Sequence, residues 1–179
     1  MKIFITGAGG FLGSELTKSL RAFDFKLVCP SSSDCNLFSD QALKNFNEEK
    51  FDIIFHLAAW TQAGDFCLKH PGEQWINNQR LNTNVVNWWK ERQSKAKLVF
   101  MGTSCAYAPG SSLTEEEYLK GEPIDSLYTY AMTKRMILQG ALALEKQFGL
   151  KWLCLVPSTL YGEKYHTDGR QMHFIFDLI

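Results

Sequence analysis

Lys2-Ile3-Phe4-Ile5-Thr6-Gly7-Ala8-Gly9-Gly10-Phe11-Leu12-Gly13 joins a short apolar run to glycines spaced G-x-x-G-x-x-G. Residues 2–6 have the length and apolar character of a buried strand. From Phe11 to Ala22, leucines recur at intervals of four, which predicts a helix. A glycine-rich turn between a strand and a helix lets backbone N–H groups approach a pyrophosphate. The stretch therefore predicts a dinucleotide site, the alternative being a tight turn that binds nothing.

The rest of the chain alternates short apolar segments with longer helical stretches. Further strands are expected at 26–29, 52–57, 97–102 and 151–156, and helices after Ser39, within 72–92 and over 127–148. Strands separated by helices predict an α/β fold, a doubly wound parallel sheet of the Rossmann type with helices on both faces. The connection 106–126 is rich in Gly, Pro, Ser and Glu, and its length predicts a functional loop.

The composition favours a compact domain that binds small molecules. The chain has 179 residues, of which 45% are hydrophobic, and a formal net charge of zero. No cluster of Lys and Arg stands out, so neither nucleic-acid binding nor binding to an acidic membrane is expected. No apolar run has the length of a signal peptide or a membrane span, and the five cysteines form no C-x-x-C pair. We therefore expect a cytoplasmic location and free thiols.

Tyr130 and Lys134 lie four residues apart in the last expected helix and so share one face of it. A nearby cation favours the phenolate, which would bring a phenol with an ordinary pKa of about 10 towards acid–base use near neutral pH. Such pairs are common on ordinary helices. The pair gains weight from Gly102-Thr103-Ser104-Cys105, which ends the preceding strand, because ligands bind at the carboxyl ends of parallel strands.

Together these motifs resemble the extended short-chain dehydrogenase/reductases, the NAD-dependent epimerase/dehydratase family, over essentially the whole chain. Two further segments are similar to motifs of that family: His56-Leu57-Ala58-Ala59 and Val156-Pro157-Ser158-Thr159-Leu160-Tyr161-Gly162. The resemblance implies a catalytic triad. Thr103 would position the substrate, Tyr130 would transfer the proton, and Lys134 would tune the phenol and bind the ribose.

The resemblance also implies the binding residues. The cofactor would contact Gly7, Gly10, Phe11, Leu12, Gly13, Asn36, Leu57, Ala58, Ala59, Tyr130, Lys134 and Pro157, and the substrate would contact Thr103, Ser104, Thr159 and Arg170. Thr159 stands where the family often has Asn. The segment Pro30-Ser31-Ser32-Ser33, after the second strand, has neither the acidic residue typical of NAD binding nor an arginine. NADP is therefore slightly favoured over NAD.

Within the family, the likeness is greatest to the GDP-L-fucose synthase branch, which comprises epimerase/reductases of nucleotide-linked 4-keto sugars. Nucleotide-sugar 4,6-dehydratases carry an Asp-Glu pair where this chain has Ser104 and Cys105, so dehydration is disfavoured. Epimerisation beside a keto group needs a base and an acid on opposite faces of the ring. The resemblance implies Cys105 and His173 for these roles, the alternatives being an inert thiol and a helix-face histidine. No metal is expected.

Three functions stay open on the sequence alone: an epimerase/reductase, a nucleotide-sugar 4-epimerase and a non-catalytic NAD(P)-binding module. The 4-epimerase needs no acid–base pair of Cys105 and His173. Thr103, Tyr130 and Lys134 favour an enzyme, because a protein that only binds the dinucleotide needs no phenol beside the nicotinamide.

The expected organisation is an NAD(P)-binding domain over 1–162 and the start of a substrate-binding region over 163–179, with most of the C-terminal substrate domain absent. The resemblance implies a homodimer formed through the helices at 72–92 and 127–148. Trp88 and Trp89 are adjacent and cannot both face the same core. Either one of them lies at an oligomer contact, or one is buried and the other covers a loop.

Overall fold

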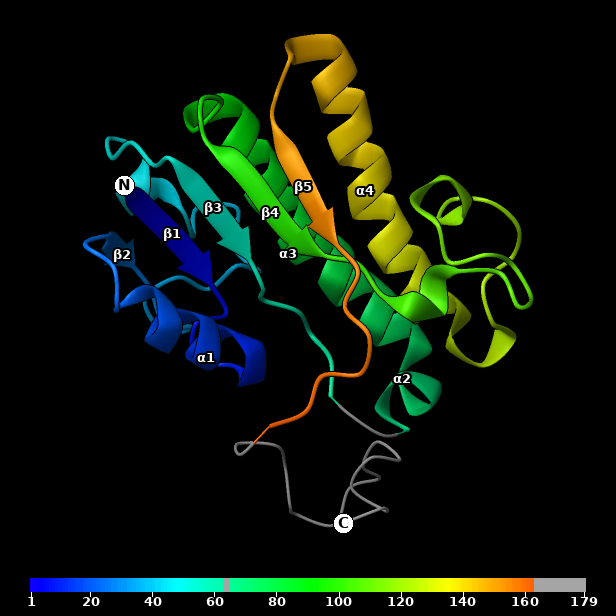
Figure 1. Cartoon of the computed structure of the whole chain (residues 1–179). Helices are drawn as coiled ribbons and strands as arrows, with labels where there is room; N and C mark the ends of the chain where they lie inside the picture. Colours follow the sequence, from blue (N-terminus) through cyan, green and yellow to red (C-terminus); the bar gives the residue numbers. More distant parts are fainter. Residues whose placement is uncertain (63–64, 163–179) are drawn as a thin grey trace.

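The computed structural model describes residues 1–62 and 65–162. Its five strands form one parallel sheet in the order β2-β1-β3-β4-β5 (Figure 1). The strands are β1 (Lys2–Thr6), β2 (Lys26–Val28), β3 (Ile53–His56), β4 (Lys97–Met101) and β5 (Trp152–Leu155). The predicted parallel sheet is confirmed. The strand order reverses between β1 and β3, and ligands of open α/β sheets bind at such a switch point.

Helices cover both faces of the sheet, as predicted (Figure 1). They are α1 (Phe11–Leu20), α2 (Phe66–Lys69), α3 (Pro71–Arg92) and α4 (Tyr128–Phe148). On one face α3 and α4 pack against each other and share a core with Phe4, Ile54 and Leu98 of the strands. On the other face, Leu12 and Leu16 of α1 line a cleft with Phe55 of β3. Because side chains alternate along a strand, Ile54 and Phe55 point to opposite faces of the sheet.

The adjacent tryptophans are both buried within the chain, with 5% of Trp88 and none of Trp89 exposed. The Trp88 ring lies 5.1 Å from the Phe4 ring, and its Nε1–H donates to Asn47 Oδ1 at 3.1 Å. Trp89 Nε1–H donates to the Ala96 carbonyl at 2.9 Å. Each indole thus has its own polar partner within the chain, and both rings are covered by the chain itself.

The prediction of a helix after Ser39 is wrong. The segment forms turns and a short 3₁₀ helix at Lys44–Phe46. Asn36 Oδ1 accepts a hydrogen bond from the Phe38 N–H at 3.1 Å, and Ser39 Oγ accepts one from the Gln41 N–H at 3.2 Å. Such bonds from side chains to nearby backbone groups compete with helix formation. Ser39, which resembles a helix N-cap in the sequence, therefore stabilises a turn.

The long connection between β4 and α4 is confirmed as a loop, and it contains three short 3₁₀ helices at Ser104–Ala106, Glu115–Glu117 and Asp125–Leu127. After this loop α4 runs to Gly149, whose φ of 69° closes the helix in the left-handed region, as expected of a C-terminal glycine.

The described residues 1–62 and 65–162 contain no helix that is long and apolar enough to cross a membrane. Across the same residues, no three His, Cys, Asp or Glu side chains gather as metal ligands would. The five cysteines are all free thiols.

Candidate cofactor-binding and catalytic site

The glycine turn after β1 is shaped by close backbone contacts. Gly7 has a φ of +70°, and its carbonyl accepts a hydrogen bond from the Gly10 N–H at 3.0 Å. A Cβ atom on Gly7 would lie 2.6 Å from the Ala58 nitrogen, and one on Gly13 would lie 2.1 Å from the Gly7 oxygen. Gly10 is the N-cap of α1, and no side chain caps this helix end. The turn thus leaves a helix N-terminus available for an anion, as a pyrophosphate site requires.

The segment after β3 forms the second wall of the same crevice. The Ala58 N–H donates to Thr6 Oγ1 at 3.3 Å, and the close approach of Gly7 holds residues 57–59 against the glycine turn. Leu12, Leu57 and Pro157 line one cleft of about 370 Å³ on the same side of the sheet. The structure therefore brings together the cofactor residues predicted in three separate segments.

Other predicted binding residues stay predictions. Asn36 is exposed, and its side-chain oxygen accepts a backbone hydrogen bond within the turn after β2. Ser104 is exposed and Thr159 half-buried, each near the carboxyl end of its strand. Arg170 and His173 lie outside the described residues.

Thr103 is fixed at the carboxyl end of β4 by its neighbours. It is 8% exposed, and its N–H donates to Tyr118 Oη at 3.0 Å. Its Oγ1 accepts a long hydrogen bond from the Cys105 N–H at 3.4 Å. A Cβ atom on the preceding Gly102 would lie 2.7 Å from Tyr118 Oη. Gly102 therefore has to be a glycine for Tyr118 to reach Thr103.

Tyr130 and Lys134 of α4 complete the predicted triad. The Lys134 ammonium lies 5.9 Å from the centre of the Tyr130 ring, and the Tyr130 hydroxyl is hydrogen-bonded to the Thr103 side chain. The three side chains that the sequence suggests for catalysis thus lie together. They come from the end of β4 and from one face of α4, next to the crevice.

The electrostatics of this group differ from the prediction. Burial raises the pKa of Tyr130 to about 12, although the hydrogen bond from Thr103 lowers it. Burial also lowers the pKa of Lys134, to about 8. The expectation that the ammonium brings the phenol towards neutral pH is therefore wrong for the chain alone, because desolvation of the phenolate is the largest cause of the shift and the only lowering cause is Thr103 rather than Lys134. Tyr130 is a neutral phenol at pH 7 and can donate a proton.

Arg135 holds the loop that carries Tyr118, a role that the sequence did not indicate. It is 7% exposed and directly follows Lys134 in the sequence. Its guanidinium donates to the Ala106 carbonyl at 2.9 Å, to the Gly121 carbonyl at 2.7 Å and to the Lys120 carbonyl at 2.8 Å. These carbonyls lie at the two ends of the loop, so one side chain ties the loop to α4.

Replacing Arg135 by methionine is expected to lower the free energy of unfolding by about 2–4 kcal/mol, because the buried Ala106 carbonyl and the part-buried Lys120 and Gly121 carbonyls lose a charged donor. Arg135→Lys should recover only part of this loss, since an ammonium lacks the planar fork. Urea denaturation checks both, with the exposed Arg92→Met as the control. Equal midpoints for Arg135→Met and Arg92→Met would contradict the assigned role.

Two thiols lie near Tyr130. Cys105 is half-buried in the turn after Thr103 and close enough to Tyr130 for its charge to raise the phenol's pKa. Cys67 of α2, which the sequence did not suggest, lines a cleft of about 220 Å³ together with Tyr130. Its sulfur lies 3.6 Å from Thr61 Oγ1 and from Gln74 Nε2. Burial raises the pKa of the Cys67 thiol, so it is protonated at neutral pH.

Comparison with known proteins shows the family of the chain. The sequence profile of the NAD-dependent epimerase/dehydratase family matches residues 3–179. The chain belongs to this family. The resemblance that the motifs indicated is thereby confirmed.

Relatives within the epimerase/dehydratase family include enzymes of GDP-sugar metabolism. The chain is 25% identical to a GDP-L-colitose synthase from Yersinia pseudotuberculosis, over 98% of this chain and 58% of that protein. It is 29% identical to a GDP-L-fucose synthase from Dictyostelium discoideum, over 93% of this chain and 55% of that protein. The chain thus spans a little over half the length of these relatives.

Solved structures of the family show the same architecture. A GDP-D-glycero-L-gluco-heptose synthase from Campylobacter jejuni, determined in the presence of NADPH, has a TM-score of 0.83 and 28% identity, over 94% of this chain and 50% of that one. A GDP-mannoheptose C4 reductase from the same organism, with NADP bound, has a TM-score of 0.82 and 26% identity, over 92% and 53% of the two chains.

Proposed function

We propose that the chain is the cofactor-binding part of an NADP-dependent epimerase/reductase that acts on a GDP-linked 4-keto sugar. The observation that carries this proposal is the meeting of Thr103, Tyr130 and Lys134 at the carboxyl end of β4, on the edge of the parallel sheet that also carries the glycine turn. The names of the relatives support the GDP-sugar class, since a GDP-L-fucose synthase and a GDP-mannoheptose C4 reductase are among them. NADPH and NADP in the two Campylobacter jejuni structures support the choice of dinucleotide.

The protonation state of the site fits the reductive direction. A bound NADPH would supply the hydride. The chain's own contribution is to hold the keto oxygen between the Thr103 hydroxyl and the Tyr130 phenol and to deliver a proton to it. A phenol with a pKa of about 12 is protonated at pH 7 and can serve as that acid. Lys134 would contact the ribose with an ammonium that is still charged at this pH.

Epimerisation adds an acid–base step for which Cys105 is the candidate that the sequence predicts. Its thiol follows the substrate-positioning Thr103 by two residues and lies close to Tyr130. We propose that it exchanges a ring proton next to the keto group, with His173 on the other face. Loss of epimerisation but retention of reduction in Cys105→Ser would support this role, and full activity would favour a 4-epimerase.

The first test is a titration of the purified chain with NADPH and, separately, with NADH, followed by nicotinamide fluorescence. NADPH should bind more tightly. Gly10→Asp should weaken it by at least about tenfold, because a carboxylate at the N-terminus of α1 repels the phosphates. Failure of the folded chain to bind either dinucleotide would contradict the proposed function.

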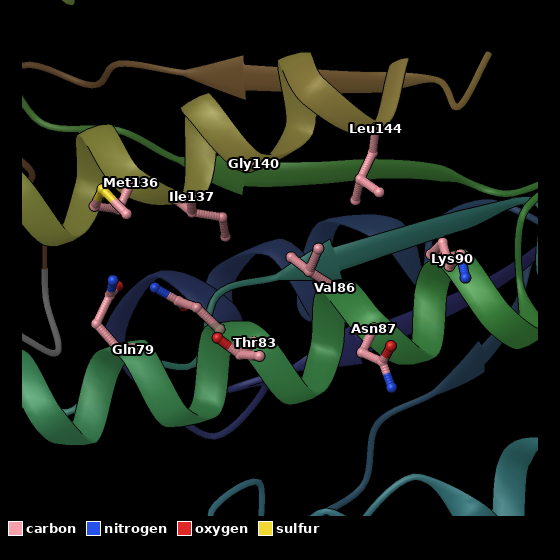
Figure 2. A pocket seen from close by; sticks show the side chains of 10 residues that line it. Gln79, Thr83, Val86, Asn87, Lys90, Met136, Ile137, Gly140 and Leu144 are labelled. Carbon is pink, nitrogen blue, oxygen red and sulfur yellow. The ribbon is translucent and has the colours of Figure 1, made fainter. Parts of the chain in front are cut away.

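We also propose that α3 and α4 pair two copies of the chain. A groove of about 300 Å³ runs between the two helices (Figure 2). The apolar Met136, Ile137 and Leu144 line it from α4 together with Gly140, and Val86 lines it from α3 together with the polar Gln79, Asn82, Thr83, Asn87 and Lys90. Met136 is 46% exposed. A Cβ atom on Gly140 would meet nothing within 4 Å, so packing within the chain does not require a glycine that costs roughly 1 kcal/mol in a helix. Close approach of a helix from a second copy of the chain would explain why this position is a glycine.

Sedimentation velocity tests this pairing. The wild-type chain should sediment as a dimer, and Gly140→Arg as a monomer, because a long charged side chain would fill the groove. Gln139→Arg adds the same charge one residue away, outside the groove lining, and should remain dimeric. A monomeric wild-type chain, or dissociation by both variants alike, would exclude this interface.

A further inference from the structure

A chain of hydrogen bonds crosses the sheet directly behind the crevice. The Ala58 N–H donates to Thr6 Oγ1 at 3.3 Å, Thr6 Oγ1 lies 2.8 Å from His56 Nδ1, and His56 Nε2 lies 2.9 Å from Asn82 Oδ1. Thr6 and His56 end the neighbouring strands β1 and β3, where they are also paired in register. Asn82 belongs to α3. The chain of bonds therefore joins two strand ends and a helix.

The direction of these bonds follows from the atoms involved. Asn82 Oδ1 can only accept, so the His56 Nε2 atom carries the proton. His56 Nδ1 is then an acceptor for the Thr6 hydroxyl, and the Thr6 oxygen accepts from Ala58. The three bonds thus all run in one direction, from Ala58 towards Asn82. His56 is 4% exposed, and burial lowers its pKa to about 4, so the ring stays neutral at pH 7.

The Ala58 end of this chain lies at the cofactor crevice. Gly7 approaches the Ala58 backbone so closely that a Cβ atom would lie 2.6 Å from its nitrogen. The distance between the glycine turn and the segment 57–59 is therefore set by this backbone contact and by the bond from Ala58 to Thr6. The hydroxyl proton of Thr6 is in turn donated to His56 Nδ1.

We propose that His56 and Asn82 are positioning residues for the dinucleotide: through Thr6 they hold the Leu57–Ala59 segment against the glycine turn. Neither side chain needs to touch the cofactor for this. The proposal rests on the proposed function for its ligand, whereas the hydrogen-bond chain itself is a property of the protein.

The decisive comparison is between Thr6→Val and Thr6→Ser. Valine keeps the branched shape and removes the hydroxyl, whereas serine keeps the hydroxyl. Thr6→Val should weaken NADPH binding by about ten- to hundredfold, because the Ala58 N–H and His56 Nδ1 lose their shared partner, and Thr6→Ser should bind within about threefold of the wild type. Asn82→Leu should weaken binding as well, and the double variant with Thr6→Val should lose less than the product of the two single effects.

Arg80→Gln, at an exposed position of α3 that lines neither the crevice nor the groove between α3 and α4, is the control and should bind NADPH as the wild type does. Amide hydrogen exchange of Ala58 provides a second measurement that needs no ligand: exchange should be at least about tenfold faster in Thr6→Val and return to the wild-type rate in Thr6→Ser. A wild-type chain that binds no dinucleotide would contradict the proposed function alone. Unchanged Ala58 exchange in Thr6→Val, or a serine variant as impaired as the valine variant, would overturn the positioning role.

Discussion

Replacing Gly13 by alanine is expected to lower the free energy of unfolding by about 3 kcal/mol or more and to abolish dinucleotide binding. The added Cβ atom would lie 2.1 Å from the Gly7 oxygen and 2.8 Å from the Ala8 Cα atom. Both are backbone atoms, so the clash is relieved only if α1 moves away from the turn. The turn cannot yield in the other direction, because Gly7 already contacts the Ala58 backbone.

Gly9→Ala is the matched control, since it makes the same substitution in the same turn. A Cβ atom on Gly9 would meet no heavy atom within 4 Å, and its φ is not positive. Its effect on the free energy of unfolding should stay within about 1 kcal/mol. Urea denaturation followed by the fluorescence of the buried Trp88 and Trp89 measures both variants. Similar midpoints for the two variants would show that the close contact at Gly13 does not matter.

The parts of the fold and site that the sequence predicted correctly are encoded locally. The strand at 2–6, the glycine turn and the helix from Phe11 follow one another without interruption, so their periodicity and spacing suffice. Tyr130 and Lys134 are likewise brought to one face by helix geometry alone. The helix wrongly expected after Ser39 is the converse case, because a serine before a polar stretch can cap a helix or close a turn.

The parts that the sequence did not reveal depend on contacts between distant residues. Tyr118 meets Thr103 across fifteen residues, and Arg135 meets the Ala106 carbonyl across twenty-nine. No periodic pattern connects such pairs, and an arginine beside Lys134 in the sequence is equally compatible with an exposed position. Cys67 approaches Tyr130 only because α2 and the start of α4 form one cleft.

Burial was the other missing quantity, and it decides the chemistry of the triad. Spacing indicates that Tyr130 and Lys134 are neighbours, but the pKa of each depends on how far the chain excludes water from it. Because desolvation dominates at both groups, the phenol's pKa rises and the ammonium's falls. Both pKa values thus shift in the direction opposite to the one that spacing alone predicts, and Tyr130 stays a protonated phenol at pH 7.

Replacing Lys134 by methionine is expected to stabilise the fold at pH 7 while impairing cofactor binding. Burial lowers the pKa of Lys134 from 10.5 to about 8, so folding takes a charged ammonium out of water. This difference in pKa corresponds to a destabilisation of the folded state by at most roughly 3 kcal/mol at pH 7. Because the residue retains partial exposure, we expect a gain of about 1–2 kcal/mol for Lys134→Met, whose side chain keeps a similar length without the charge.

The dependence on pH separates this explanation from a simple packing effect. Between pH 8 and pH 10.5 the unfolded chain keeps its lysine proton while the folded chain loses it, so the stability of the wild type relative to the variant rises through this window. The advantage of Lys134→Met should therefore be greatest below pH 8 and shrink towards pH 10. Urea denaturation across this range measures it, with the exposed Lys151→Met as the control. An advantage that does not change with pH would assign the gain to packing, and a destabilised variant would show that the ammonium is already compensated within the chain.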